Sequence, residues 1–176
     1  MKFYSGFSLI DDERFFSKYL KKSDYTVAGF SYGAIEAFLE VKTRLKHSQR
    51  VDTLQLFSPA FFQTQSSKYK KLQMIFYGKN PELYIQNFLE NSFSPLKVQK
   101  IEQIPTTKEQ LHELLYFEWS VAELLELKEQ GVIIEIYLGG LDKIVDAQAA
   151  KDFFLDVGDV TFIKNGNHFL IQKGEE

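Results

Sequence analysis

Short apolar segments alternate with amphipathic segments along both ends of the chain. The apolar segments predict strands near residues 3–4, 25–28, 51–57, 132–137 and 160–163. The amphipathic segments between them predict helices over 11–22, 34–45 and 147–155. Because strands alternate with helices, the pattern predicts an α/β fold, with a mostly parallel sheet and helices on both of its faces.

The segment 61–125 interrupts this alternation. It contains scattered aromatic residues, many Gln and Lys residues, and the beginning of a long helical stretch over 108–130. We expect this segment to form a helical cap inserted above the sheet, and residues 1–176 to form one domain.

The composition excludes several classes of protein. With 44% hydrophobic and 26% charged residues, the chain is typical of globular proteins and unlike disordered or fibrous ones. It has no cysteine, which excludes disulfides, a thiolate nucleophile and a Cys-zinc site. Its net charge of -3 argues against general nucleic-acid binding. No signal peptide or membrane span is visible, so we expect a cytoplasmic protein.

The strongest local motif is Gly29-Phe30-Ser31-Tyr32-Gly33, between a predicted strand and a predicted helix. This is the setting of a nucleophile elbow, in which serine occupies a sharp, strained turn. Side chains two positions before and after the serine would collide with such a turn, so glycine is needed there. The motif predicts that Ser31 is a nucleophile; the alternative is a glycine-rich turn with a solvated serine.

A nucleophilic serine needs a base, and the chain offers three histidines. His47 and His112 lie in polar, helical surroundings and are expected at the surface. His168 follows the last predicted strand, in a loop at the carboxyl edge of the sheet, where parallel α/β folds gather functional groups. We therefore expect His168 to be the base.

The base needs an acid that holds its tautomer and stabilises the imidazolium. Asp142 follows the 132–137 strand and the loop 138–141, so it shares the strand-end edge with Ser31 and His168. Asp146 is the alternative, but it stands just before a predicted helix, where it also suits an N-cap. The order serine, acid, histidine is that of α/β-hydrolases, and it favours Asp142.

Two backbone N–H groups should stabilise the oxyanion. One is expected from Tyr32, directly after the nucleophile, and the other from the loop 5–8 after the first strand. In that loop Gly6 allows close approach of the backbone, and Phe7 would supply the N–H. Taken alone, the loop also fits an ordinary turn between a strand and a helix.

These residues resemble the α/β-hydrolases and, more narrowly, the short, atypical pimelyl-acyl carrier protein methyl ester esterases of biotin synthesis. The resemblance rests on residues 3–7 (FYSGF), 27–34 (VAGFSYGA), 56–59 (LFSP) and 138–146 (LGGLDKIVD), together with Asn167 and His168. It implies that Ser31, Asp142 and His168 form a catalytic triad, with Phe7 and Tyr32 as oxyanion donors. It also implies hydrolysis of a methyl ester on an acyl chain that is still attached to its carrier protein.

The sequence departs from ordinary α/β-hydrolases in two ways. The oxyanion loop begins a few residues from Met1, so we expect the usual leading strands to be missing from the sheet. The common His-Gly pair before the oxyanion donor is Ser5-Gly6 here. No metal or organic cofactor is expected, because the histidines are far apart and no phosphate-binding glycine loop occurs.

An acyl carrier protein is acidic, so its partner should offer a basic surface. Residues 61–100 carry a net charge of +4 within a chain of net -3. We therefore expect docking on the cap at Lys68, Lys70 and Lys71, although a solvated helical insertion would have a similar charge. Some of the cap's aromatic residues should line a tunnel for the acyl chain, and most should form the core of the cap.

Two other functions stay open at this point. A general short-chain esterase or thioesterase would use the same residues, because the site of cleavage depends on how the acyl chain is placed. A hydrolase-like binding protein without catalytic activity would keep the fold and lose the chemistry.

Overall fold

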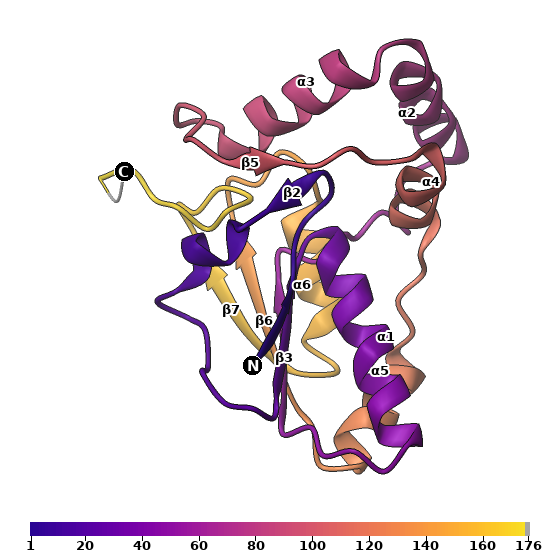
Figure 1. Ribbon diagram of the computed structural model, residues 1–176, viewed down its shortest axis with the longest axis vertical. Coiled ribbons are helices and arrows are strands. Elements are labelled where there is room, and N and C mark those ends of the chain that lie inside the picture. Colours follow the sequence, from indigo (N-terminus) through magenta and orange to yellow (C-terminus); the bar gives the residue numbers. More distant parts are fainter. Residues whose placement is uncertain (175–176) are drawn as a thin grey trace.

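The computed structural model describes residues 1–174 and is built around a five-stranded parallel sheet of order β1-β3-β4-β6-β7 (Figure 1). The strands are β1 (Lys2–Tyr4), β3 (Thr26–Phe30), β4 (Thr53–Phe57), β6 (Ile133–Gly139) and β7 (Asp159–Ile163). Each predicted apolar segment forms one of these strands, so the predicted α/β class is confirmed. Because all five strands are parallel, their carboxyl ends meet at one edge.

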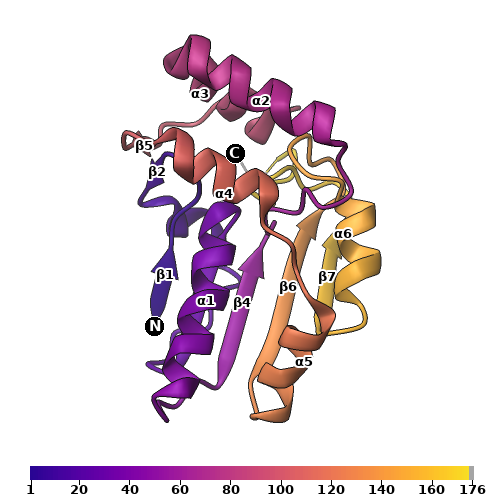
Figure 2. The same cartoon turned by 90° about the vertical axis from the view of Figure 1, so that its right-hand side faces the viewer.

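Three α-helices cover one face of the sheet, as Figure 2 shows. They are α1 (Tyr32–Lys46), α5 (Val121–Glu129) and α6 (Ala147–Phe154). Buried aromatic rings fill the space beneath them: the Trp119 ring lies 5.5 Å from Phe38 of α1 and 5.3 Å from Phe154 of α6.

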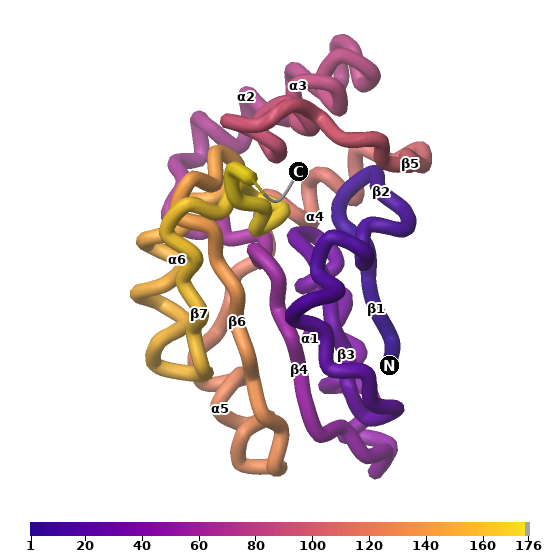
Figure 3. The backbone as a smooth tube through the Cα atoms, turned by 90° about the vertical axis from the view of Figure 1, so that its left-hand side faces the viewer, coloured from indigo at the N-terminus to yellow at the C-terminus, as the bar shows by residue number. Residues whose placement is uncertain are grey.

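The opposite face, seen in Figure 3, is covered by the N-terminal segment and the chain after β7. The N-terminal segment contains a short 3-10 helix, η1 (Asp12–Phe16). Its Phe16 ring lies 4.7 Å from Phe57 and 4.8 Å from Phe30, and Phe169 contacts Phe30 at 4.8 Å. Both faces are thus covered, although the second cover contains only one short helix.

The helix predicted over 11–22 is wrong beyond the five residues of η1. Asp11 adopts a left-handed conformation (φ 58°), and the Asp12 side chain turns inward to the backbone of Gly6. Acidic residues that suit the first turn of a helix are used here for a tertiary contact instead.

Helices α2 (Ser67–Lys79), α3 (Pro81–Phe93) and α4 (Lys108–Tyr116) lie over the carboxyl edge of the sheet (Figures 1 and 2). A small antiparallel sheet of β2 (Leu9–Ile10) and β5 (Glu102–Gln103) joins this layer to the N-terminal segment. None of the helices within residues 1–174 is long and apolar enough to cross a bilayer.

The helical stretch predicted over 108–130 is two helices, not one. The chain leaves α4 at Phe117, and the indole Nε1 of Trp119 donates to the carbonyl of Ala60 over 2.8 Å. The side chain of Ser120 then caps the new helix α5. Within the segment 61–125, α2, α3 and α4 therefore lie over the sheet edge, whereas α5 packs on the sheet face.

The start of α1 packs directly on the end of β1, which gives a test of the fold. A Cβ added to Gly33 would lie 2.2 Å from the carbonyl oxygen of Tyr4 and 2.4 Å from that of Ser5. We expect Gly33→Ala to lower the free energy of unfolding by about 2 kcal/mol or more, since backbone must move. Urea denaturation followed by circular dichroism measures the loss.

The matched control is Gly78→Ala in α2, where an added Cβ would meet no atom within 4 Å. We expect this variant to be more stable than the unsubstituted protein by up to about 1 kcal/mol, because alanine favours a helix. Equal stabilities of the two variants would contradict the close contact at Gly33.

Candidate active site

Ser31 occupies the turn between β3 and α1 with a strained backbone (φ 53°, ψ -113°). Its N–H donates to Phe57 O over 2.9 Å, and its carbonyl accepts from the N–H groups of Ala34 and Ala60, both over 3.1 Å. These three bonds tie the turn to the end of β4, to the chain just after β4 and to the first turn of α1, and they hold the strained conformation in place.

Both glycines of the motif are required, as predicted, but for different neighbours. A Cβ on Gly29 would lie 2.0 Å from the carbonyl oxygen of Gly33, within the turn itself. The neighbour of Gly33 is instead the backbone of Tyr4, at the end of β1, and of Ser5, where the predicted oxyanion loop begins. The second glycine thus brings that loop against the nucleophile turn.

Asp142 and His168 form a buried pair. The Nδ1 atom of His168 lies 2.6 Å from Asp142 Oδ2, and both side chains are 0% exposed. The other carboxylate oxygen accepts the N–H groups of Ile144 (2.7 Å) and Val145 (3.1 Å), which fixes the carboxylate. In a neutral His168, an Nδ1–H donated to Asp142 leaves Nε2 as the acceptor, which is the form a general base needs.

The loops that carry this pair touch through their backbones. A Cβ on Gly139 would lie 2.1 Å from the carbonyl oxygen of Asn167, and Leu141 N donates to Gly166 O over 2.8 Å. Glycine is therefore needed where β6 ends, because the Asp142 loop and the His168 loop meet there.

Asn167 anchors the histidine loop, a role that the sequence analysis did not predict, because it used Asn167 only as part of the family pattern. It is fully buried; its side-chain oxygen accepts from the N–H groups of Phe169 (3.0 Å) and Ile171 (3.1 Å). Its side-chain nitrogen donates to the carbonyl of Phe93, at the end of α3, over 2.9 Å. No local pattern indicates that distant partner.

The alternative residues lie outside the buried pair. Asp146 is exposed and caps α6 by accepting from Ala149 N over 3.0 Å. His47 is exposed at the end of α1, with a ring nitrogen 2.8 Å from the carbonyl of Thr43. His112 is also exposed, and its ring stacks on Tyr116 at 4.3 Å.

The link between Ser31 and His168 is open in this structure. Ser31 Oγ and His168 Nε2 are both buried, and neither has a hydrogen-bond partner among residues 1–174. His168 nevertheless lies beside the elbow, because the ring of Phe30, the residue before Ser31, is 4.9 Å from its imidazole. Hydrogen bonds between catalytic groups are often long without substrate and form only when it binds.

A second hydroxyl at the same edge also has no hydrogen-bond partner within the described residues. Ser58 directly follows β4, and its Oγ is buried. In the sheet β4 lies between β3, which leads to Ser31, and β6, which leads to Asp142. Its backbone is left-handed (φ 39°). Sequence analysis used Ser58 only as part of a family pattern.

The predicted oxyanion residues come together at the elbow. Tyr32 is the first residue of α1, and Phe7 lies in a tight turn closed by Leu9 N donating to Gly6 O over 3.0 Å. The rings of Phe7 and Tyr32 are 6.4 Å apart. The turn is tied to the chain beside β5, because Ser8 Oγ donates to the carbonyl of Ile104 over 2.8 Å.

The Tyr32 side chain joins the elbow to α4, which lies above it. Its phenol donates to Glu113 Oε2 over 2.7 Å. Burial raises the pKa of Tyr32 well above its ordinary value, and the carboxylates of Glu113 and Glu36 raise it further. Burial also raises the pKa of Glu36, and the nearby Glu113 adds to that rise.

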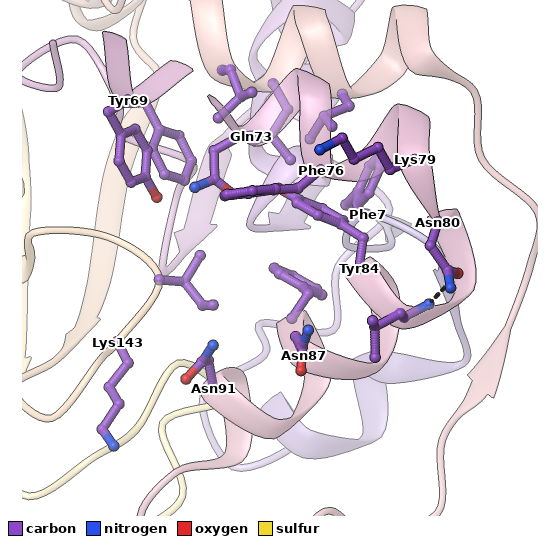
Figure 4. Close-up of a pocket in the computed structure, with 17 residues that line it drawn as sticks. Phe7, Tyr69, Gln73, Phe76, Lys79, Asn80, Tyr84, Asn87, Asn91 and Lys143 are labelled. Carbon is purple, nitrogen blue, oxygen red and sulfur yellow. Dashed lines mark hydrogen bonds between the residues drawn. The ribbon is translucent and has the colours of Figure 1, made fainter. Parts of the chain in front are cut away.

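A cavity of about 500 Å³ lies between α2, α3 and α4 (Figure 4), and Lys143 and Ile144, which follow Asp142, also line it. Such a volume suits a small organic ligand. The lining is mostly aromatic and aliphatic, with side-chain amides and two cations but no carboxylate: Phe7, Phe62, Tyr69, Gln73, Phe76, Lys79, Asn80, Leu83, Tyr84, Asn87, Phe88, Asn91, Leu111, Leu114, Leu115, Lys143 and Ile144.

The predicted triad residues do not line this cavity. Phe88 lies between it and the imidazole, 6.3 Å from His168 and 6.2 Å from Phe7, measured between ring centroids. Ser31 and His168 are 1% and 0% exposed. Ser31 is therefore closed off from the cavity in this structure.

The predicted docking lysines differ in exposure. Lys68 and Lys71 are exposed on α2, but Lys70 is buried, with its Nζ 5.2 Å from the centroid of the Tyr116 ring. The prediction for Lys70 is therefore wrong, because this lysine lies on the face of α2 that packs against α4 and not on the exposed face.

Within residues 1–174, no group of three or more His, Asp or Glu side chains could hold a metal ion.

Asp12 is the buried acid that the sequence analysis missed. It is 0% exposed, its Oδ2 accepts the N–H of Gly6 over 2.8 Å, and its Oδ1 has no partner among the described residues. The carboxylate thus fixes the backbone of the predicted oxyanion loop at Gly6. Burial raises the pKa of Asp12 above its ordinary value of 3.8, although the Ser5 hydroxyl and the Gly6 N–H lower it.

No family model and no curated protein matches this chain. Solved structures do. BioG from Haemophilus influenzae superposes with a TM-score of 0.59 at 11% identity, over 96% of this chain and 87% of that chain. Naproxen esterase (carboxylesterase NP) from Bacillus subtilis has a TM-score of 0.52 at 18% identity, over 82% and 53%. An esterase from Exiguobacterium antarcticum has a TM-score of 0.51 at 15% identity, over 81% and 59%.

These likenesses show the fold. The chain has the α/β-hydrolase fold, which it shares with structures named as esterases and hydrolases. It spans only about half the length of the Bacillus esterase, 53%, but most of BioG.

The raised pKa of Asp12 predicts a specific dependence of stability on pH. The folded chain binds this proton more tightly than the unfolded chain does. Between 3.8 and the raised pKa, the folded state therefore holds more protons, and stability falls as the pH rises. Asp12→Asn keeps an acceptor for Gly6 N–H but does not ionise, so we expect it to remove this decrease. Urea unfolding at a series of pH values measures the difference.

Asp11→Asn is the matched control, because Asp11 is exposed and adjacent. It should leave the pH dependence unchanged. If the stabilities of the Asp12→Asn variant and the unsubstituted protein run parallel at every pH, the account of Asp12 fails.

Proposed function

We propose that this protein is a cytoplasmic serine carboxylesterase that hydrolyses the methyl ester of pimelyl-acyl carrier protein in biotin synthesis. The observation that carries the proposal is the buried Asp142–His168 pair beside a serine on a strained turn. A fixed carboxylate, an imidazole with a free Nε2 and a turn-borne hydroxyl are the parts of a catalytic triad.

The first half of the reaction forms an acyl-enzyme. His168 Nε2 takes the proton of Ser31 as Oγ attacks the ester carbonyl carbon, and Asp142 stabilises the resulting imidazolium. The carbonyl oxygen becomes an oxyanion, which accepts hydrogen bonds from the N–H groups of Tyr32 and Phe7. Each such donor is worth roughly a hundredfold or more in rate. When the intermediate collapses, the methoxy group takes the proton from His168 and leaves as methanol.

The second half repeats these steps with water. His168 removes a proton from the water molecule as its oxygen attacks the acyl carbon of the ester on Ser31. The Ser31–acyl bond then breaks, Ser31 Oγ regains a proton from His168, and the free carboxylate is released. No cofactor takes part in either half.

The cavity suits the acyl group. Its apolar walls would hold the methylene chain, and Phe7 and Phe88 would move aside so that the ester reaches Ser31. Lys79 and Lys143 in the lining, without a carboxylate, favour a substrate whose far end is anionic. The shared length with BioG supports a short esterase of the kind the sequence resembles.

Two other functions have an observation in their favour. A general short-chain esterase or thioesterase agrees with the esterases that share the fold at 15–18% identity. A binding protein without catalysis agrees with the open link between Ser31 Oγ and His168 Nε2. The two experiments below separate these possibilities.

The first experiment incubates the protein with methyl-pimelyl acyl carrier protein and measures the mass of the carrier. We expect loss of the mass of one methylene group, as the ester becomes a carboxylate with the thioester intact. Ser31→Ala should lower the rate by several orders of magnitude, whereas Ser58→Ala, the matched control with another buried hydroxyl, should keep most of it. Release of the whole acyl group would indicate a thioesterase, and unchanged turnover by Ser31→Ala would remove Ser31 from the reaction.

The second experiment compares Asp142→Asn with Asp146→Asn, using a nitrophenyl ester. Asp142→Asn should lower kcat by up to about 10⁴-fold, because the amide favours the wrong tautomer of His168. Asp146→Asn keeps a side-chain oxygen that can cap α6, so its kcat should stay within about twofold of the unsubstituted value. A larger loss in Asp146→Asn than in Asp142→Asn would show that the acid is misassigned.

A further inference from the structure

Helix α2 presents a continuous stripe of exposed side chains to solvent. The stripe recurs at intervals of three and four residues, which places its members on one helix face: Lys68, Lys71, Leu72, Ile75, Phe76 and Lys79. Leu72, Ile75 and Phe76 are 39%, 50% and 52% exposed, so the middle of the stripe is apolar. We call this set the α2 stripe.

The opposite face of α2 accounts for its packing in the cap. Lys70 and Tyr77 are buried there, and the phenol of Tyr77 donates to the carbonyl of Thr106 over 2.6 Å. The inner face of α2 is thus the face that packs into the cap, and the middle of the stripe lies on the opposite, exposed face.

The lysines of the stripe are not neutralised. Helix α2 contains four lysines and no acidic residue. Within residues 1–174, neither Lys68, Lys71 nor Lys79 takes part in an ion pair. Positive charge thus stands at both ends of an exposed apolar centre, in a protein whose net charge is -3.

From this arrangement we infer that the α2 stripe docks an acidic amphipathic helix of a partner protein. The apolar centre lies on the single helix α2, and an apolar row of this kind suits packing against one other helix. Lys71 and Lys79 are eight residues apart, roughly 12 Å along the helix at 1.5 Å per residue. The partner helix should therefore carry acidic groups about two turns apart, on either side of apolar residues.

The neighbouring helix argues against a flat anionic membrane as the occupant. Helix α3 lies beside α2 in the cap (Figures 1 and 2) and exposes Glu82 and Glu90. An extended anionic surface seated on both helices would meet these carboxylates, whereas a single helix seated on α2 would not.

The stripe also borders the cavity. Phe76 and Lys79 belong to the stripe and to the cavity lining (Figure 4). A partner held on α2 would thus place a tethered group at the cavity. This part of the inference rests on the proposed function, in which the acyl chain arrives on an acidic carrier.

The test measures binding and turnover separately, with residues of the stripe that do not line the cavity. Lys68→Glu/Lys71→Glu and Leu72→Ser/Ile75→Ser are each mixed with fluorescently labelled methyl-pimelyl acyl carrier protein. We expect each pair to weaken binding about tenfold or more, and to leave hydrolysis of a small nitrophenyl ester within about twofold. Added salt should shrink the effect of the lysine pair, because it screens charge, but not that of the apolar pair.

The matched control is Lys46→Glu/Lys128→Glu, which makes the same charge change at exposed positions in the last turns of α1 and α5. It should bind the carrier normally. If it weakens binding as much as the stripe pair does, the effect is one of net charge, and the inference is overturned. It is also overturned if the apolar pair binds normally, or if the stripe binds phosphatidylserine vesicles and not the carrier.

Failure of the proposed function gives a different result. Binding that depends on the stripe, without any hydrolysis of the carrier-bound methyl ester, would leave the docking surface standing and remove the proposed reaction. Hydrolysis of the carrier-bound methyl ester that neither stripe pair changes would support the proposed reaction and remove the docking surface.

Discussion

The site depends on close contact between backbones at the carboxyl edge of the sheet, where no side chain fits. Gly29 and Gly33 allow the nucleophile turn to close and to meet the loop after β1. Gly139 allows the loops of Asp142 and His168 to touch. Parallel strands bring their ends to a common edge. The loops that follow the strands come within bonding distance of one another because glycine has no Cβ at the points of contact. The buried Asp142–His168 bond follows from that contact.

The parts of the site that could be predicted are those with a local signal. The spacing of two glycines around Ser31, between an apolar strand and an amphipathic helix, specifies the elbow within a few residues. Asp142 and His168 could be chosen because each follows an apolar strand, and Asp146 could be set aside as a helix cap. These inferences use only neighbours in sequence and the rule that parallel strands share an edge.

The contacts that hold the site in place could not be predicted. Asn167 bonds to Phe93 and Tyr32 bonds to Glu113, across 74 and 81 residues of chain. No pattern near either residue indicates such a partner. The two incorrect helices have a similar cause, because Asp12 turns inward to Gly6, and Trp119 reaches Ala60 where the 108–130 helix would continue. In each case a tertiary contact outweighs the local preference.

The bond from Asn167 to the carbonyl of Phe93 has a consequence for how such proteins diversify. The fixed point for the His168 loop is supplied by the last turn of the cap helix α3, not by the sheet. A cap taken from another protein of the α/β-hydrolase fold would need a carbonyl at the same place, or the buried amide would lose its acceptor. Chimaeras and insertions should therefore be tolerated in the middle of the inserted segment more readily than at this junction.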